Sequence, residues 1–230
     1  IVNDKIYLLD QNNKIICLNV KDGSIIWNLL TISSFIKSQK LLSLAISKEG
    51  NLFSLNSSAD LYKIDSNTGD VFWSSNTLES LSPDATDFFI SSEIVLTKNE
   101  VIFSAGTSFF SYDQNTGSIN WEIKANSVGT PIIDGEKIFF VTDNGYFVIL
   151  NKNDGKIISS SNILKILKKK KQNTKVTGFI MGSGKIYSTT LNGYLIVSSA
   201  NSGAVEYVRK VGDPITTSPI IVNGKLYILT

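Results

Sequence analysis

The side chains best placed for chemistry in this sequence are the carboxylates and amides of a short loop, Asp65-Ser66-Asn67-Thr68-Gly69-Asp70. Oxygen ligands in such a loop can hold calcium, but a calcium loop places its glycine sixth and a bidentate Glu twelfth. Here the glycine is fifth and the twelfth residue is Asn76. The same Asp-to-Gly spacing recurs from Asp113 to Gly117. We therefore interpret both loops as hairpin turns and predict no metal site.

Residues for nucleophilic catalysis are scarce. The chain has no histidine, which excludes Ser-His-Asp triads, Cys-His dyads and His-ligated zinc. Its one cysteine, Cys17, excludes an intrachain disulfide and a cysteine metal cluster. Residues 14–20 around it have the pattern of a strand, so we expect a buried or half-buried side chain rather than a nucleophile. The sequence predicts no catalytic residue, no cofactor and no enzyme activity.

The composition is that of a globular chain. It has 230 residues, 42% hydrophobic and 18% charged, with 22 Lys+Arg against 20 Asp+Glu. The balanced charge gives no whole-chain basis for nucleic-acid binding, and the apolar content excludes intrinsic disorder. The uncharged run of residues 186–205 is too rich in Ser, Thr, Asn and Gly to span a bilayer. We therefore predict no transmembrane segment.

Two short phrases recur along the chain. The first, as in Asn67-Thr68-Gly69-Asp70-Val71-Phe72-Trp73, has five copies. Their glycines are spaced 46, 48, 38 and 48 residues apart and are Gly23, Gly69, Gly117, Gly155 and Gly203. The second phrase, as in Lys5-Ile6-Tyr7, places an aromatic residue 14 or 16 residues before each glycine. Two markers in register over five copies predict a repeat architecture.

Each repeat has the chemistry of a four-stranded antiparallel meander. In the fourth repeat we expect strands at residues 130–133, 137–142, 146–151 and 156–159, because segments rich in Ile, Val and Phe alternate there with Asp, Asn and Gly. Such sheets bury both faces by stacking around an axis, as in a β-propeller. The predicted fold is therefore all-β, a β-propeller of four-stranded antiparallel blades. About five blades are present, in one domain over residues 1–230.

The ends of the chain carry the same part of the repeat. Residues 1–10 resemble residues 221–230, so we expect the chain to begin and end within a blade, as a fragment of a larger propeller. The Gly-His and Trp-Asp pairs of WD40 blades and the Gly-Gly doublet of kelch blades are absent from the sequence.

The repeat resembles that of the PQQ-like propellers, whose phrase is Leu/Ile-Asp-x-x-Thr-Gly-x-x-x-Trp. Residues 64–73 match it fully and residues 112–121 nearly so, whereas the last two copies have Ser159 and Tyr207 at the tryptophan position. The resemblance covers essentially the whole chain. It implies a complete ring of seven or eight blades.

The resemblance also implies that the glycine and the tryptophan four places later lock neighbouring blades together. Burying an indole removes some 150–250 Å² from water, worth roughly 4–6 kcal/mol before entropy costs. The blade-locking residues expected in this way are Gly23, Trp27, Gly69, Trp73, Gly117, Trp121, Gly155 and Gly203.

Among PQQ-like propellers, the chain is most similar to outer-membrane assembly factors of the BamB type. These are lipid-anchored periplasmic lipoproteins that help β-barrel proteins enter the outer membrane. The resemblance implies a non-catalytic scaffold that binds the main barrel-assembly subunit. Two alternatives stay open: a fragment of a quinone- and calcium-dependent dehydrogenase, and a ligand-sensing propeller domain of a larger receptor. The vicinal disulfide of many quinoproteins cannot form in a chain with one cysteine.

Segments between repeats are the candidates for partner docking, because propeller loops carry function. Residues 29–42 are unusually apolar for a loop, and residues 164–175 hold six lysines. The apolar segment either docks a partner or packs over a blade edge. The lysine segment is either a solvated, mobile loop or a dock for an acidic protein surface or anionic lipid head groups. The partner-binding residues expected are Phe35, Ile36, Lys168, Lys169, Lys170 and Lys171.

Overall fold

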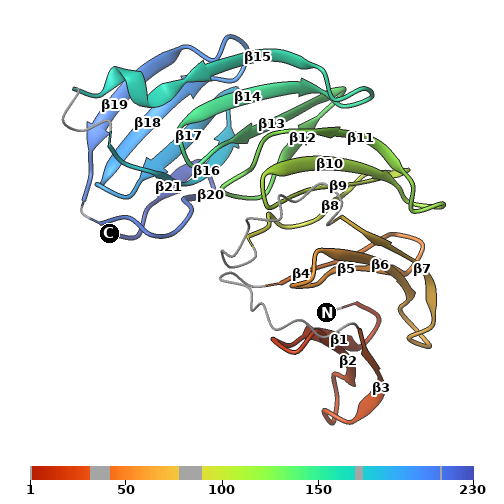
Figure 1. The fold of residues 1–230 in the computed structure, drawn as a ribbon. Helices are drawn as coiled ribbons and strands as arrows, with labels where there is room; N and C mark the ends of the chain where they lie inside the picture. The colour runs from red at the N-terminus through yellow and green to blue at the C-terminus, as the bar shows by residue number, and fades with distance from the viewer. Residues whose placement is uncertain (1, 32–41, 78–89, 169–172, 213) are drawn as a thin grey trace. The chain divides into compact units, whose positions relative to one another are not determined.

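The computed structural model describes residues 2–31, 42–77, 90–168, 173–212 and 214–230. Over these ranges the chain forms antiparallel β-sheets and one 3-10 helix, with no α-helix. The chain divides into two compact units, Ile1–Lys124 and Ala125–Thr230. Figure 1 labels the strands of both units in chain order. The expectation of a single domain over residues 1–230 stays a prediction.

The first unit contains a three-stranded sheet followed by two four-stranded sheets, each an antiparallel meander in chain order. The three-stranded sheet consists of β1 (Lys5–Leu9), β2 (Lys14–Asn19) and β3 (Ile25–Leu30). The next sheet consists of β4 (Ser43–Ile46), β5 (Asn51–Leu55), β6 (Asp60–Asp65) and β7 (Val71–Asn76). The third consists of β8 (Val95–Leu96), β9 (Glu100–Ala105), β10 (Ser108–Asp113) and β11 (Ile119–Ile123).

The second unit repeats this plan with two four-stranded sheets and a two-stranded one. The first consists of β12 (Ile132–Asp134), β13 (Lys137–Val141), β14 (Tyr146–Asn151) and β15 (Ile157–Asn162). The 3-10 helix Ile163–Ile166 follows. The next sheet consists of β16 (Val176–Gly182), β17 (Lys185–Thr190), β18 (Tyr194–Ser199) and β19 (Val205–Lys210). β20 (Ile220–Val222) and β21 (Lys225–Tyr227) form the last sheet.

The fourth repeat shows how closely the predicted strand bounds agree with the observed ones. Its four strands all form, and β14 has the predicted bounds. The fourth strand continues to Asn162 instead of ending at residue 159, because Ser160, Ser161 and Asn162 pair with the other strand of the hairpin, β14. Serine and asparagine suggest a loop by composition, but they are tolerated on this outermost strand, which has a single strand partner.

Sheets in the first unit pack face to face. One cluster joins Ile15 and Cys17 of β2 to Leu52 of β5. Another joins Phe53 of β5 to Phe103 of β9. Neighbouring residues of β5 thus face opposite sheets, as the pleat of a strand requires. The alternation buries both faces of the sheet β4 to β7, as expected for stacked blades.

A β-bulge accompanies the recurring glycine in every repeat, with its extra residue three places after the glycine. The register between the third and fourth strands shifts by one residue at five equivalent places: Cys17/Leu18, Lys63/Ile64, Ser111/Tyr112, Ile149/Leu150 and Val197/Ser198. A bulge increases the local twist and changes the direction of the strand. The fourth strand is therefore bent just before its tryptophan position, which pairs again with the preceding strand, as Trp73 does with Lys63.

Candidate protein-docking surface

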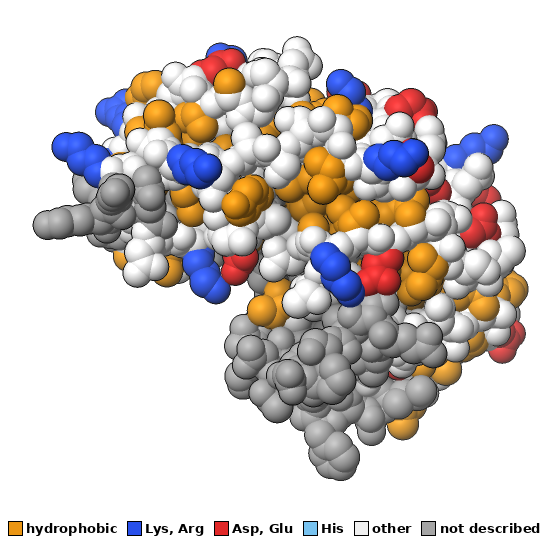
Figure 2. Space-filling view, turned by 45° about the horizontal axis from the view of Figure 1, so that its top comes forward, with side chains coloured by type: hydrophobic (Ala, Val, Ile, Leu, Met, Phe, Trp, Pro, Cys, Tyr) orange, Lys and Arg blue, Asp and Glu red, His pale blue; other side chains and the backbone are white. Residues whose placement is uncertain are grey.

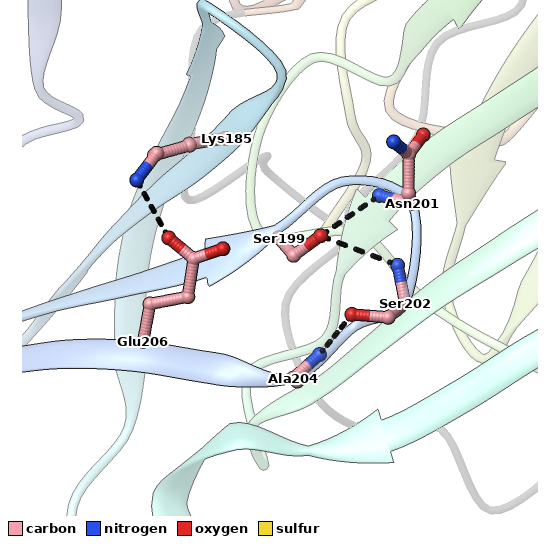
Figure 3. A network of polar contacts seen from close by, with 6 residues as sticks. All are labelled: Lys185, Ser199, Asn201, Ser202, Ala204 and Glu206. Carbon is pink, nitrogen blue, oxygen red and sulfur yellow. Dashed lines mark hydrogen bonds and ion pairs between the residues drawn. The ribbon is translucent and has the colours of Figure 1, made fainter.

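The turn between the third and fourth strands uses its polar side chains to bind its own backbone. Asp65 Oδ1 accepts the N–H of Asn67 at 2.7 Å, and in the last repeat Ser199 Oγ accepts the N–H of Asn201 at 3.3 Å (Figure 3). The side chain of the residue just before each glycine accepts the backbone N–H of the residue two places later, as Ser202 Oγ does from Ala204. These oxygens serve a turn, which confirms the hairpin interpretation of residues 65–70.

Every repeat has both side-chain contacts. The residues four before the glycine that accept an N–H are Asn19, Asp65, Asp113, Asn151 and Ser199. Those just before the glycine are Asp22, Thr68, Thr116, Asp154 and Ser202. Within the described ranges, no group of three or more His, Cys, Asp or Glu side chains could hold a metal ion. That the protein needs no metal or cofactor stays a prediction.

The tryptophans of the first two repeats lie on the following repeat's turn. Trp27 Nε1 donates to the carbonyl of Ser66 at 3.0 Å, and a Cβ built on Gly69 would lie 2.9 Å from Trp27 Cδ2. Trp73 Nε1 donates to a carbonyl in the next turn in the same way, at 3.1 Å, and a Cβ on Gly117 would lie 2.7 Å from the Trp73 ring. Glycine therefore leaves room for the indole at both turns.

Other contacts are described for the later repeats. Trp121 is buried and its ring is stacked on Phe109, with 6.1 Å between the ring centroids. The fourth repeat has Ser159 at the tryptophan position. Two residues later, Ser161 Oγ donates to the carbonyl of Gly203 at 2.9 Å. A Cβ on Gly23 would have no described heavy atom within 4 Å. That the eight predicted glycines and tryptophans lock neighbouring blades together stays a prediction.

The opposite end of the sheets carries a second repeated turn, which the sequence analysis missed. The side chain at its first residue accepts the N–H four residues on, as Asn56 does from Asp60 and Thr142 from Tyr146. The end of the fourth strand then donates an N–H to this turn: Thr77 to Ala59 O at 3.1 Å, and Ile163 to Gly145 O at 2.9 Å. A search for Asp, Asn or Thr four residues before the third strand would have found it.

A buried polar network joins two of these turns in the first unit. Ser57 Oγ donates to Asn13 Oδ1 at 3.0 Å, and Thr31 Oγ1 accepts from Asn56 Nδ2 at 3.3 Å. Asp60, only 4% exposed, accepts from the amide groups of Asn56 and Asn76. Burial raises the pKa of the Asp60 carboxyl, although these amide hydrogen bonds oppose the shift. Thr31 and Thr77, the last described residues of β3's and β7's continuations, both donate their backbone N–H at this end, to Asn13 O and Ala59 O.

The structure locates only part of the predicted docking residues. Phe35, Ile36, Lys169, Lys170 and Lys171 lie outside the described residues. Lys168 is described and exposed, just after the 3-10 helix.

Part of the lysine segment is not a solvated loop, and that interpretation of residues 164–175 is wrong for its beginning. Leu164 and Leu167 are buried. Asn162 caps the helix by accepting the N–H of Leu164 at 3.0 Å. The lysines around these leucines hide the short apolar pattern in the sequence.

Cys17 is a core residue. It is fully buried in β2 within the first core cluster, as the sequence predicts. Burial raises the pKa of its thiol, so the reactive thiolate is disfavoured. In the part of the chain that is described, no helix is long and apolar enough to cross a membrane.

Solved structures similar to this chain are propellers of several kinds. BamB from Moraxella catarrhalis matches with a TM-score of 0.80 and 14% identity, over 99% of this chain and 67% of that chain. Quinohemoprotein alcohol dehydrogenase from Comamonas testosteroni matches with a TM-score of 0.69 and 14% identity, over 94% and 42%. The C-terminal WD40 domain of Sif2 matches with a TM-score of 0.67 and 12% identity, over 92% of this chain and 56% of that chain. These likenesses confirm the β-propeller fold.

Comparison of sequences identifies the family. A search of curated proteins found no match. A family profile described as outer membrane protein assembly factor BamB matches residues 1–161, which is more than half of the chain. The profile agrees with the repeat phrase and with the meander sheets, and the chain belongs to the family of the outer membrane protein assembly factor BamB.

Proposed function

We propose that this chain is a non-catalytic protein-interaction scaffold that assists assembly of β-barrel proteins into the outer membrane. The observation that supports this most is the family profile of an assembly factor over residues 1–161, together with a backbone match to BamB over 99% of the chain. The partner we propose is the main barrel-assembly subunit. The location we propose is the periplasm, in association with the outer membrane.

The proposed mechanism is docking by loops on a stiff frame. In the first unit, the ends of β3 and β7 are hydrogen-bonded to a buried network around Asn56 and Asp60. Segments that leave the sheets there start from fixed points, which lowers the entropy lost when they bind a partner. Phe35 and Ile36 are our first candidates for contact. Lysines 168 to 171 are our second.

Phe35 and Ile36 offer the sharper test. Burying one such side chain in an interface contributes roughly 1.5–3 kcal/mol, so replacing both with Ser is expected to weaken binding at least about tenfold. The measurement is calorimetric titration of the full-length protein with the purified barrel-assembly subunit. A matched control is Ile157→Ser with Ile158→Ser, because those side chains are 61% and 53% exposed on β15. The control is expected to bind as the unaltered protein does.

Two results would count against this docking role. One is unchanged binding by the Phe35→Ser, Ile36→Ser variant. The other is loss of its cooperative unfolding transition, which would mean that residues 29–42 pack over a blade edge. Circular dichroism during thermal unfolding separates the two.

The dehydrogenase alternative is kept because an alcohol dehydrogenase of the quinohemoprotein class matches with a TM-score of 0.69. The described residues do not fit a calcium-held quinone, because the repeated turn side chains are engaged by backbone N–H groups and no acidic cluster is present among them. Titration of the full-length protein with PQQ and calcium, followed by absorbance, tests this alternative. Saturable quinone binding would favour the dehydrogenase over the scaffold.

A further inference from the structure

Hydrogen bonds join distant segments into one surface at an end of the second unit. The 3-10 helix begins where Ile163 donates its N–H to Gly145 O, at 2.9 Å, in the hairpin between β13 and β14. From the same hairpin, Asp143 pairs with Lys175 Nζ at 3.2 Å. The helix also packs against β19. Residues near 163 and near 175 are therefore held to one hairpin.

Lys175 continues this surface to the next sheet. Its carbonyl accepts the N–H of Leu191 at 2.9 Å, in the hairpin between β17 and β18. Lys210 Nζ donates to the carbonyl of Asn192 in that hairpin at 2.6 Å. Val211 donates its N–H to Gly193 O at 2.9 Å. The end of β19 is thereby fixed beside Leu191.

The surface mixes basic and aliphatic side chains. Ile166, Leu191 and Val211 are 54%, 46% and 37% exposed, and the Lys175 side chain is 72% exposed. Figure 2 shows Lys and Arg side chains lying among hydrophobic ones on the face in view. We call this surface the basic rim, defined as Lys165, Ile166, Lys168, Lys175, Leu191, Lys210 and Val211.

We propose that the basic rim binds the surface of an anionic phospholipid membrane. The lysine ammonium groups would lie among the head-group phosphates, while Ile166, Leu191 and Val211 enter the boundary between head groups and acyl chains. Lysine near an anionic leaflet gains electrostatic energy without fixed partner geometry. Aliphatic side chains beside it add the apolar area that interfacial binding requires.

The composition favours a membrane over an acidic protein as the occupant. Protein interfaces are depleted of lysine and enriched in aromatic residues and arginine. The basic rim has four lysines and three aliphatic residues, with no aromatic residue and no arginine among them. Mobile lipid head groups can neutralise charges spread over several segments, such as Lys165, Lys168 and Lys210. This proposal does not depend on the scaffold function, because its test contains no other protein.

The test is co-sedimentation of the full chain with vesicles of phosphatidylglycerol and phosphatidylcholine, compared with vesicles of phosphatidylcholine alone. Binding to the anionic vesicles alone is expected, and salt should weaken it by screening. Each lysine contributes about fivefold in affinity, so the triple variant Lys165→Gln, Lys168→Gln, Lys210→Gln should bind about a hundredfold more weakly. Ile166→Ser with Leu191→Ser should weaken binding further at high salt.

The matched control is Lys137→Gln with Lys225→Gln. Both lysines are exposed and follow first-to-second-strand hairpins, at the other end of their sheets. The control should bind as the unaltered chain does. The proposal is overturned if the folded chain ignores anionic vesicles, or if the control and the rim variant lose binding equally. Binding to polyglutamate but not to vesicles would replace the membrane with an acidic protein partner.

Discussion

Two glycines with the same backbone conformation separate the effect of conformation from that of packing. Gly23 and Gly117 have φ of +71° and +70°. A Cβ on Gly23 would meet no described atom within 4 Å, whereas one on Gly117 would lie 2.7 Å from Trp73 Cδ2. Both turns have a positive φ, but among the described residues only the second turn receives a neighbouring indole.

Gly23→Ala is expected to lower the free energy of unfolding by about 1–2 kcal/mol, the cost of a positive φ in a residue with a Cβ. Gly117→Ala should lower it by that amount and by about 1–3 kcal/mol more, because the indole must move. Urea unfolding of the two variants, followed by tryptophan fluorescence, measures the difference. Equal losses would mean that the Trp73 contact contributes nothing.

The carboxylate of Asp113, in the repeated turn of the third repeat, should make the free energy of unfolding fall at acidic pH. The N–H groups of Thr116 and Asn115 hold the pKa of Asp113 below its usual value. A lowered folded pKa gives stability that is present above the unfolded pKa and is lost as pH falls through the folded one. In the Asp113→Asn variant, the free energy of unfolding measured by urea titration should therefore differ less between neutral and acidic pH than in the unaltered protein. An unchanged difference would rule out this contribution.

At the scale of elements, the hairpin between β5 and β6 is held by a buried carboxylate with the opposite dependence on pH. Asp60 accepts from Asn56 Nδ2 at 3.3 Å and from Asn76 Nδ2 at 2.5 Å, which ties the hairpin to the end of β7. Desolvation raises the folded pKa of Asp60. The folded protein therefore keeps this proton to a higher pH than the unfolded chain does.

The contribution of Asp60 to the free energy of unfolding is fully present below the pKa of an unfolded Asp, about 3.9. It is lost as pH rises through the folded pKa of Asp60. Asp60→Asn should remove that loss, so thermal unfolding of the variant should be less sensitive to pH between about 4 and neutral. The same loss of stability across this interval in the variant and in the unaltered protein would contradict the assignment to Asp60.

Strands and glycine turns follow from the sequence because their determinants are local. Gly155 and the polar residues before it bind backbone groups within one turn, so the pattern survives in a single sequence. The 3-10 helix is different, since its burial depends on Leu164 lying over Gly145, nineteen residues earlier. Lysine-rich composition around that leucine predicts the opposite, a solvated loop.

At the scale of the whole molecule, the repeat spacing predicts the propeller, and the resemblance of the repeat phrase to that of PQQ-like propellers implies the family. Five glycine turns in register require a stack of similar sheets, and the backbone match to BamB bears this out. The basic rim is harder to predict from the sequence, because its side chains come from segments that are adjacent only in the folded chain. The lysines of residues 164–175 are visible in the sequence, but Leu191 and Lys210 are nineteen residues apart and adjoin only after β18 and β19 pair, so their part of the basic rim has no sequence signature.

The scaffold role is tested most directly by affinity capture. The full-length protein serves as bait in a detergent extract of its own cells, and captured proteins are identified by mass spectrometry. The account predicts recovery of the main outer-membrane barrel-assembly subunit, reduced for the bait carrying Phe35→Ser and Ile36→Ser. A folded bait that recovers no barrel-assembly subunit, and instead binds PQQ with calcium, would contradict it.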